Sequence, residues 1–132
     1  MAGYSGTPLP KKLGIKDEFR VAFLGLPAEV RTELRNALAR CRVANRKPLD
    51  FAMIFVTAAA ELKNQFPKFS EQLAPDGMLW ISWPKKTSGV ATDLDENEVR
   101  RIGLEAGLVD VKVCAVNEIW SGLKFVIRLK DR

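Results

Sequence analysis

The residues of this chain that could bind a ligand lie where three predicted strands end. They are Gly25, Arg31, Thr57, Trp83, Lys85 and Lys86. In an open sheet that is covered by helices, ligands bind beyond the carboxyl ends of the strands, where the N-termini of helices favour an anion. An aromatic ring beside basic side chains at such an edge predicts a site for a phosphate, a carboxylate or a nucleotide-like metabolite.

Each of these residues also has a purely structural interpretation. Thr57 can cap the helix that follows it, Trp83 can pack in the core, and the lysines can be solvated. The same choice applies to Trp120, in the connection before the last strand, which either covers the sheet or anchors a protein partner. Residue types and spacing favour the structural interpretation in each case.

The chain lacks the commonest general base near neutral pH and the commonest metal ligand, so any chemistry would depend on Asp, Glu, Lys, Tyr or the two thiols. It has no histidine, which excludes a Ser-His-Asp triad, a Cys-His pair and the usual zinc sites. Its two cysteines, Cys41 and Cys114, lie far apart in the sequence and are expected to be reduced thiols. Residues 93–98 are acidic but lack the spacing of a calcium loop. We therefore predict no catalytic residues and no metal site.

Positive charge is concentrated in one segment. The formal net charge is +5, and residues 29–47 contain six basic and two acidic residues. Such a segment binds phosphates or acidic partners, or forms a solvated helix face. Since no nucleic-acid-binding motif accompanies it, we favour the solvated face and expect no nucleic acid.

Neither a membrane span nor a secretory signal is expected. The longest apolar run, residues 51–60, is far shorter than the ~20 residues that cross a bilayer. The N-terminus lacks a basic region followed by an apolar one. With its two separate cysteines, the chain is expected to be cytoplasmic.

Strand and helix patterns alternate and predict a single α/β domain over residues 1–132, with residues 1–6 flexible. Residues 41–45 fit either the end of a helix or a short strand. We expect three layers, with a mostly parallel sheet of about five strands that ends in an antiparallel hairpin. Apolar runs predict strands covered on both faces at residues 19–24, 49–56 and 78–83.

Helix ends carry their own signals. Thr57 is expected to cap the helix after the second buried strand, and Pro67 to kink or divide it. Asp95 and Glu98 resemble a capping box, and Gly107 fits the left-handed end of the same helix.

The strands near the C-terminus are expected to form an antiparallel pair. Residues 75–77, Pro-Asp-Gly, predict a turn before the strand at 78–83. Two alternating sets of apolar residues are predicted to share one face of each strand of the pair. They are Val109, Val111, Val113 and Ala115 in one strand, and Phe125, Ile127 and Leu129 in the other.

The order of these elements resembles that of the class I S-adenosylmethionine-dependent methyltransferases. The resemblance lies in residues 13–16 leading into 20–25, in 49–56, in the turn and strand at 73–79, and in 105–109 with the closing pair of strands. It spans most of the chain and implies a Rossmann-like sheet whose first half is truncated.

More narrowly, the chain resembles a family of small bacterial proteins of unknown function. This resemblance covers the whole length and implies no established activity. Its motifs are Tyr4-Ser5-Gly6-Thr7-Pro8-Leu9, Lys11-Lys12-Leu13-Gly14, Trp83-Pro84-Lys85-Lys86 and Trp120-Ser121-Gly122.

The methyltransferase resemblance fails at the residues that would hold the cofactor. Phe23 stands where an acidic residue usually closes the first strand, and Leu26 and Pro27 stand where further glycines would let the cofactor approach. Proline also removes a backbone donor. Too few residues separate Gly25 from Asp50 for all the strands and helices that hold the ribose and adenine. We therefore expect no cofactor.

The leading hypothesis is a non-catalytic, methyltransferase-like module that binds a protein partner or its own copy. Truncation leaves the first strand at or near an edge of the sheet, and an exposed edge favours pairing, so a homodimer is one expectation. Two alternatives stay open: a binding site for an anionic metabolite at the strand ends, and an active methyltransferase.

Overall fold

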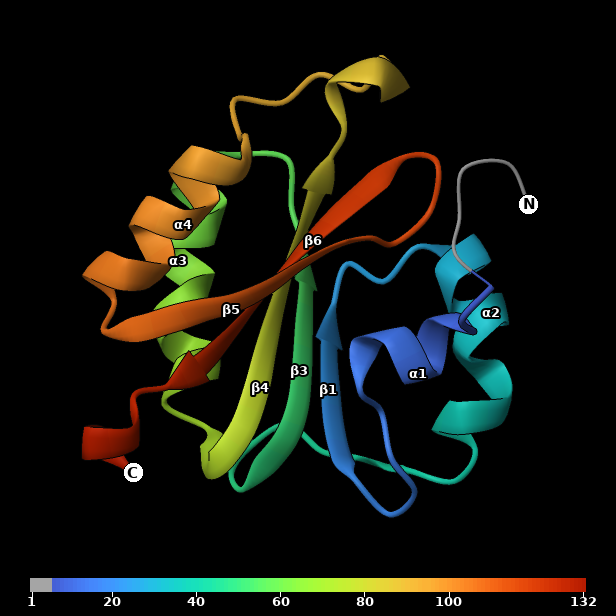
Figure 1. The fold of residues 1–132 in the computed structure, drawn as a ribbon, viewed down its shortest axis with the longest axis vertical. Coiled ribbons are helices and arrows are strands. Elements are labelled where there is room, and N and C mark those ends of the chain that lie inside the picture. The colour runs from blue at the N-terminus through green and yellow to red at the C-terminus, as the bar shows by residue number, and fades with distance from the viewer. Residues whose placement is uncertain (1–5) are drawn as a thin grey trace.

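Six strands form one mixed sheet in residues 6–132, the part of the chain that the computed structural model describes (Figure 1). The strands are β1 (Arg20–Leu24), β2 (Arg42–Val43), β3 (Leu49–Phe55), β4 (Leu73–Pro84), β5 (Leu108–Ala115) and β6 (Trp120–Ile127). Their order across the sheet is β2-β1-β3-β4-β6-β5. The first four run parallel, and β6 is antiparallel to both β4 and β5.

This architecture confirms the predicted α/β class and the antiparallel pair at the end of a mostly parallel sheet. The additional strand is β2, so part of residues 41–45 is strand rather than helix end. β2 pairs through Arg42 opposite Arg20 and Val43 opposite Val21, which leaves β1 one strand from the edge. Residues 1–6 were predicted to be flexible. Of these, residues 1–5 lie outside the described residues.

Helices cover both faces of the sheet (Figure 1). α1 (Leu9–Leu13) and α2 (Ala28–Leu38) lie on one face, and α3 (Ala59–Ser70) and α4 (Glu96–Glu105) on the other. Within residues 6–132 there is no helix with the length and apolar character needed to cross a membrane.

Each face of the sheet has its own buried cluster. On the α1–α2 face, the indole N–H of Trp80 donates to the carbonyl of Leu13 at 2.9 Å. On the α3–α4 face, the rings of Phe66 and Phe125 meet edge to face at 5.2 Å, and Trp83 joins the same cluster. Because side chains alternate along a strand, Trp80 and Trp83 point to opposite faces, as predicted.

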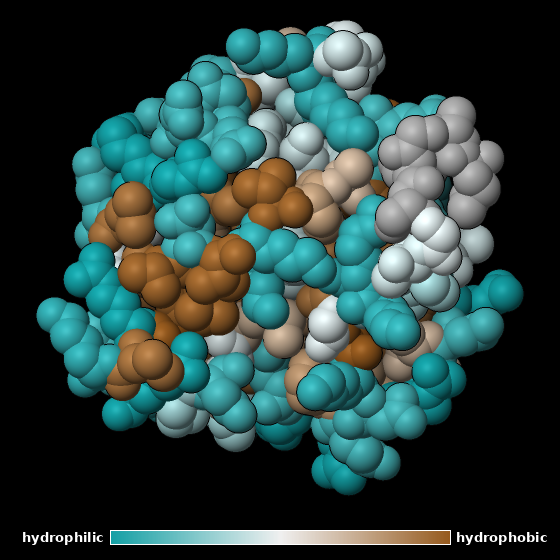
Figure 2. Space-filling view, viewed as in Figure 1, coloured by the Kyte–Doolittle hydropathy of each residue, from teal (hydrophilic) through white to brown (hydrophobic). Residues whose placement is uncertain are grey.

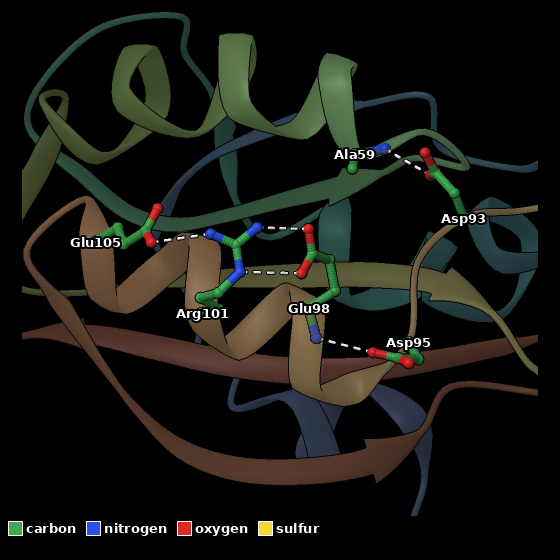
Figure 3. Close-up of polar contacts among 6 residues, drawn as sticks. All are labelled: Ala59, Asp93, Asp95, Glu98, Arg101 and Glu105. Atoms are coloured by element: carbon green, nitrogen blue, oxygen red, sulfur yellow. Dashed lines mark hydrogen bonds and ion pairs between the residues drawn. The ribbon is translucent and has the colours of Figure 1, made fainter.

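The start of α3 differs from the prediction. Thr57 is not its cap: Ala58 holds the N-cap position and makes no side-chain hydrogen bond there. Instead, the carboxylate of Asp93 accepts a hydrogen bond from the Ala59 N–H at 2.8 Å (Figure 3). The capping group thus comes from a residue 34 positions away.

Of the two outcomes predicted at Pro67, a kink or a divided helix, the division is wrong. The helix runs unbroken from Ala59 to Ser70, and Pro67 lies three residues before its end. A proline lacks an N–H donor and its ring crowds the carbonyl four residues earlier, but neither effect ends α3 here. Since the Glu71 N–H still donates to the Pro67 carbonyl at 3.1 Å, the last turn stays closed.

Both ends of α4 confirm the local signals. The Asp95 carboxylate accepts from the Glu98 N–H at 2.8 Å (Figure 3), and Gly107 has a left-handed backbone with φ +97°. The Glu98 carboxylate binds the guanidinium of Arg101 at 2.6 Å. Arg101 also binds Glu105 at 2.9 Å, so one arginine links two turns of the helix.

The turn predicted at residues 75–77 is wrong, because β4 begins at Leu73 and passes through it. The irregularity appears as a shift in the β3–β4 register between Leu49 and Phe51. Gly77 lies at this shift, where a Cβ would come within 2.4 Å of the Leu49 carbonyl. Gly77 therefore allows β3 to approach β4 closely and does not form a turn.

The alternating valines of β5, which were predicted to share one face, lie in a partly exposed strand whose alternation is interrupted. Val111 and Val113 are 54% and 48% exposed. A bulge between Asp110 and Lys112 shifts the register with β6, and β5 is the edge strand. Figure 2 shows hydrophobic residues gathered over β5 among hydrophilic ones. The third predicted residue of the β6 face, Leu129, belongs to a 3₁₀ turn, Leu129–Asp131, and is 81% exposed.

Candidate functional site

The carboxyl ends of β1, β3 and β4 meet at one edge of the sheet, because these strands are adjacent and parallel. Gly25 follows β1, Thr57 lies just beyond β3, and Lys85 follows β4. The fold therefore brings the backbone of the predicted site residues to a common edge. Whether a ligand fits there depends on the turns and helix N-termini at this edge.

The turn after β1 carries a leucine and a proline after its exposed glycine. Gly25 has φ +71°, and a Cβ at this position would lie 2.7 Å from the Phe55 carbonyl of β3. Leu26 packs against the cluster of the α1–α2 face. Pro27 is the N-cap of α2 and has no N–H to donate. The turn thus presents a side chain and a proline ring where an open turn would present bare amides.

The helix N-termini near this edge already hold carboxylates of the chain itself. Glu29 lies in the first turn of α2. The Asp93 carboxylate occupies the Ala59 N–H at the start of α3 (Figure 3). Because a helix N-terminus carries a partial positive charge, these carboxylates satisfy the interaction that an anionic ligand would make.

The predicted site residues differ in exposure. Trp83 is only 5% exposed and packs among side chains of the α3–α4 face, so its ring lies in the core. Arg31 and Thr57 are exposed. Lys86 is exposed in the 3₁₀ turn Lys86–Ser88 that follows β4. The half-buried Lys85 donates its backbone N–H to the Ile119 carbonyl at 2.7 Å, which joins the end of β4 to the β5–β6 connection.

Trp120 lies against the end of β3. Its ring meets that of Phe55 edge to face, with centroids 5.2 Å apart and planes at 87°. It is half-buried and packs against the α1–α2 cluster. This contact accounts for the aromatic residue as a cover for the sheet.

Neither cysteine is activated. Burial raises the pKa of the Cys114 thiol, despite the lysine charges near it. Burial also raises the pKa of Cys41, and the carboxylate of Asp17 acts in the same direction. Since the thiolate is the nucleophile, both thiols are poorly reactive at neutral pH. No cluster of possible metal ligands occurs in the described part of the chain.

One groove escaped the sequence analysis. It has a volume of about 380 Å³ and lies between α3 and the β1–β2 edge of the sheet. We call it the β1–α3 groove. Its lining includes Ala22, Ala44, Leu49, Gln65, Lys68 and Phe69. These residues come from three separated segments, which explains why no local motif marked them.

Solved methyltransferases have a similar fold. A SAM-dependent methyltransferase from Aquifex aeolicus superposes with a TM-score of 0.64 at 16% identity, over 91% of this chain and 88% of that one. Precorrin-6y C5,15-methyltransferase from Geobacter metallireducens gives 0.59 at 10% identity, over 91% and 86%. Magnesium protoporphyrin IX methyltransferase from Synechocystis, with bound SAH, gives 0.59 at 11% identity, over 91% and 78%.

Sequence comparison adds no family. No protein-family model and no curated protein matches the chain. At identities this low, structural likeness concerns the fold and not the chemistry. The chain therefore has the α/β Rossmann-like fold of the methyltransferases, as the order of its elements predicted.

Proposed function

We propose that this chain is a methyltransferase-fold module without catalytic activity, which acts by binding a protein partner or its own copy. The occupied turn after β1 carries this proposal. A cofactor in that corner would need the space and the amides that Leu26 and Pro27 remove. The Phe55 carbonyl leaves no room for even a Cβ on Gly25.

The available side chains support the same function. The chain has no histidine to serve as a general base near neutral pH. Its two thiols are held in the protonated form by burial. A fold that keeps its sheet without histidine or an activated thiol has its surfaces as the simplest means of action.

Calorimetric titration with S-adenosylmethionine tests the first half of this proposal. We expect no binding heat up to millimolar cofactor, because Leu26 and Pro27 stand where the cofactor would need glycines and free backbone amides. Saturable one-to-one binding would overturn the proposal, whatever partners the chain has.

The second half is tested by the mass of the chain in solution and by recovery of partners on immobilised protein. We expect either a dimer or a partner that elutes with the chain. A strict monomer that recovers no partner would contradict the proposal.

An anionic metabolite at the strand ends is the second candidate function. The basic side chains of Arg31 and Lys86 are exposed beside this edge, which favours it. A thermal-shift screen with nucleotides and phosphorylated metabolites tests it. Stabilisation that disappears in Lys86→Ala would support an anion site, and stabilisation that persists in Lys86→Ala would exclude this one.

A further inference from the structure

One crossover of the parallel sheet has no helix. The chain passes from β1 through α2 to β2, and from β3 through α3 to β4. β1 lies between β2 and β3 in the sheet, and residues 44–48, which connect β2 to β3, contain no helix. Parallel strands are normally covered on both faces by their crossover helices. The face of β1 and β2 opposite α2 therefore lacks a helix of its own, and the β1–α3 groove lies there.

The groove has an apolar floor and one helical wall. Ala22 and Ala44 line the floor from β1 and from the residue after β2, and Phe69 lies at its side on α3. The small alanine side chains leave the space that a crossover helix would fill. In Figure 1, α3 and α4 lie toward β4, β6 and β5, and only α1 and α2 lie beside β1.

Hydrogen bonds hold the end of the groove in shape. The side-chain oxygen of Gln72 accepts a hydrogen bond from the Lys47 N–H at 2.9 Å. The backbone carbonyl of Gln72 accepts another from the Leu49 N–H, also at 2.9 Å. These bonds tie the β2–β3 connection to the end of α3. The groove is therefore built into the fold, as binding sites commonly are.

One basic side chain lines the groove, and other basic residues are bonded near its end. Lys68 lines it, and the backbone N–H of Lys47 binds the Gln72 side chain. The guanidinium of Arg20 donates to the carbonyls of Pro48 and Arg46 at 2.8 and 3.3 Å.

The positive charge at this end is largely uncompensated. Two carboxylates adjoin it: Asp50, which accepts from the Arg20 N–H, and Glu71 at the C-cap of α3. Within residues 6–132, no ion pair engages four of the cations around the groove. They are Arg20, Arg46, Lys47 and Lys68.

We infer that the β1–α3 groove binds an acidic amphipathic helix of a protein partner. Its apolar face would cover Ala22, Ala44 and Phe69, and its carboxylates would meet the cations at the groove's end. Symmetric pairing of two copies through this groove fits poorly, because it would bring the same cations into opposition. The inference rests on the proposed function, since it names the partner of a binding module.

The test uses the full chain and three labelled peptides of about 18 residues, long enough for stable amphipathic helices when stapled. One has a leucine face flanked by glutamates, the second has lysines in place of the glutamates, and the third has the acidic sequence scrambled. Fluorescence anisotropy measures each affinity. We expect the acidic peptide to bind about tenfold or more tightly than the other two, and the difference to shrink with added salt.

Matched variants locate the site. Lys68→Glu reverses a charge in the groove, and Ala44→Phe fills its floor. Lys63→Glu makes the same charge change on the same helix but lies in the separate cleft between α3 and α4. We expect the first two to weaken the acidic peptide about tenfold and Lys63→Glu to leave it unchanged. Circular dichroism and melting temperature establish that each variant is folded.

Three results of the peptide-binding measurements would overturn this inference. They are no binding of the acidic peptide, equal affinity for the lysine peptide, and equal effects of Lys68→Glu and Lys63→Glu. A dimer that Ala44→Phe dissociates would also overturn it, by showing that the groove pairs two copies. None of these results affects the cofactor titration, so the inference and the absence of cofactor binding can fail separately.

Discussion

The two ends of the sheet differ in how the α3–α4 face is covered. At the β6–β5 end, α4 lies directly on the strands: Phe125 is fully buried, and a Cβ on Gly103 would come within 2.1 Å of its ring. Arg100 of α4 also binds Asp110 of β5 at 2.8 Å. At the β1–β2 end, the same face carries a groove and Val43 is 83% exposed.

The two ends of the sheet differ in packing, and therefore in how much each is expected to contribute to stability. Close packing at the α4 end removes apolar surface from water and resists change, because interiors have little free volume. The groove end contributes less to the core and keeps its apolar surface and charge available. The chain therefore has one closely packed half and one half whose apolar surface and charge stay accessible.

The largest expected effect compares two phenylalanines of the α3–α4 face. Phe125→Ala should lower the free energy of unfolding by about 3–5 kcal/mol, because it empties a fully buried site. Phe69→Ala should cost about 1–2 kcal/mol, because its ring is half-buried beside the groove. Urea denaturation measures both. Equal losses would show that the groove end is packed as tightly as the other end.

Gly103 tests the closeness of α4 to the sheet. Gly103→Ala should destabilise the chain by about 1–3 kcal/mol, since the added Cβ meets the buried Phe125 ring. Alanine is otherwise the better helix former by about 1 kcal/mol. A stabilised variant would therefore mean that the ring moves aside. Leu104→Ala, at the next and 40% exposed position, is the control and should change the same denaturation midpoint less.

A substitution of Asp93 tests the cap of α3, the helix that lines both the β1–α3 groove and the cleft toward α4. Asp93→Ala should cost about 1 kcal/mol, the usual effect of losing an N-terminal cap. Thermal unfolding measures the loss against Asp131→Ala, an exposed carboxylate in the last 3₁₀ turn. A loss no greater than that of the control would mean that α3 does not depend on its distant cap.

The smallest expected effect concerns the ion pairs on α4. A hydrogen bond from Arg101 lowers the pKa of Glu98 below its ordinary value of 4.5. The folded chain therefore holds this carboxylate charged more readily than the unfolded chain does. The stabilisation is present above the ordinary pKa and is lost as the pH falls through the lower folded pKa.

Melting temperatures of the wild type and Glu98→Gln check this pH dependence. The wild type should melt slightly higher near pH 7, and the difference should shrink as the pH falls below 4.5 and through the lower folded pKa. Glu33→Gln, at an exposed position on α2, is the control and should show no such trend. A difference that persists in acid would assign the effect to packing.

Local chemistry made much of this fold predictable. The apolar runs that became β1 and β3 are continuous in sequence, so their burial can be inferred from residue type alone. The Asp95 cap and the Gly107 end of α4 were also predicted, because each depends on groups within a few residues. The candidate ligand edge followed from strand order, and Leu26 with Pro27 marked the occupied turn.

The predictions that failed depend on contacts between distant segments. The cap of α3 comes from Asp93 rather than Thr57, and the partial exposure of Val111 follows from the bulge and edge position of β5. The turn assigned to residues 75–77 is a strand beside Leu49. In each case the neighbour that decides the structure lies far away in the sequence.

By itself, then, the sequence determined the α/β class, the buried strands, the ends of α4 and the lack of acid–base side chains, because these properties reside in single residues or short runs. Only the tertiary structure decided which face of β1 lacks a helix, which cations gather there and which carboxylate caps α3. These properties are distances between segments that the chain brings together only on folding, and residue type does not contain them.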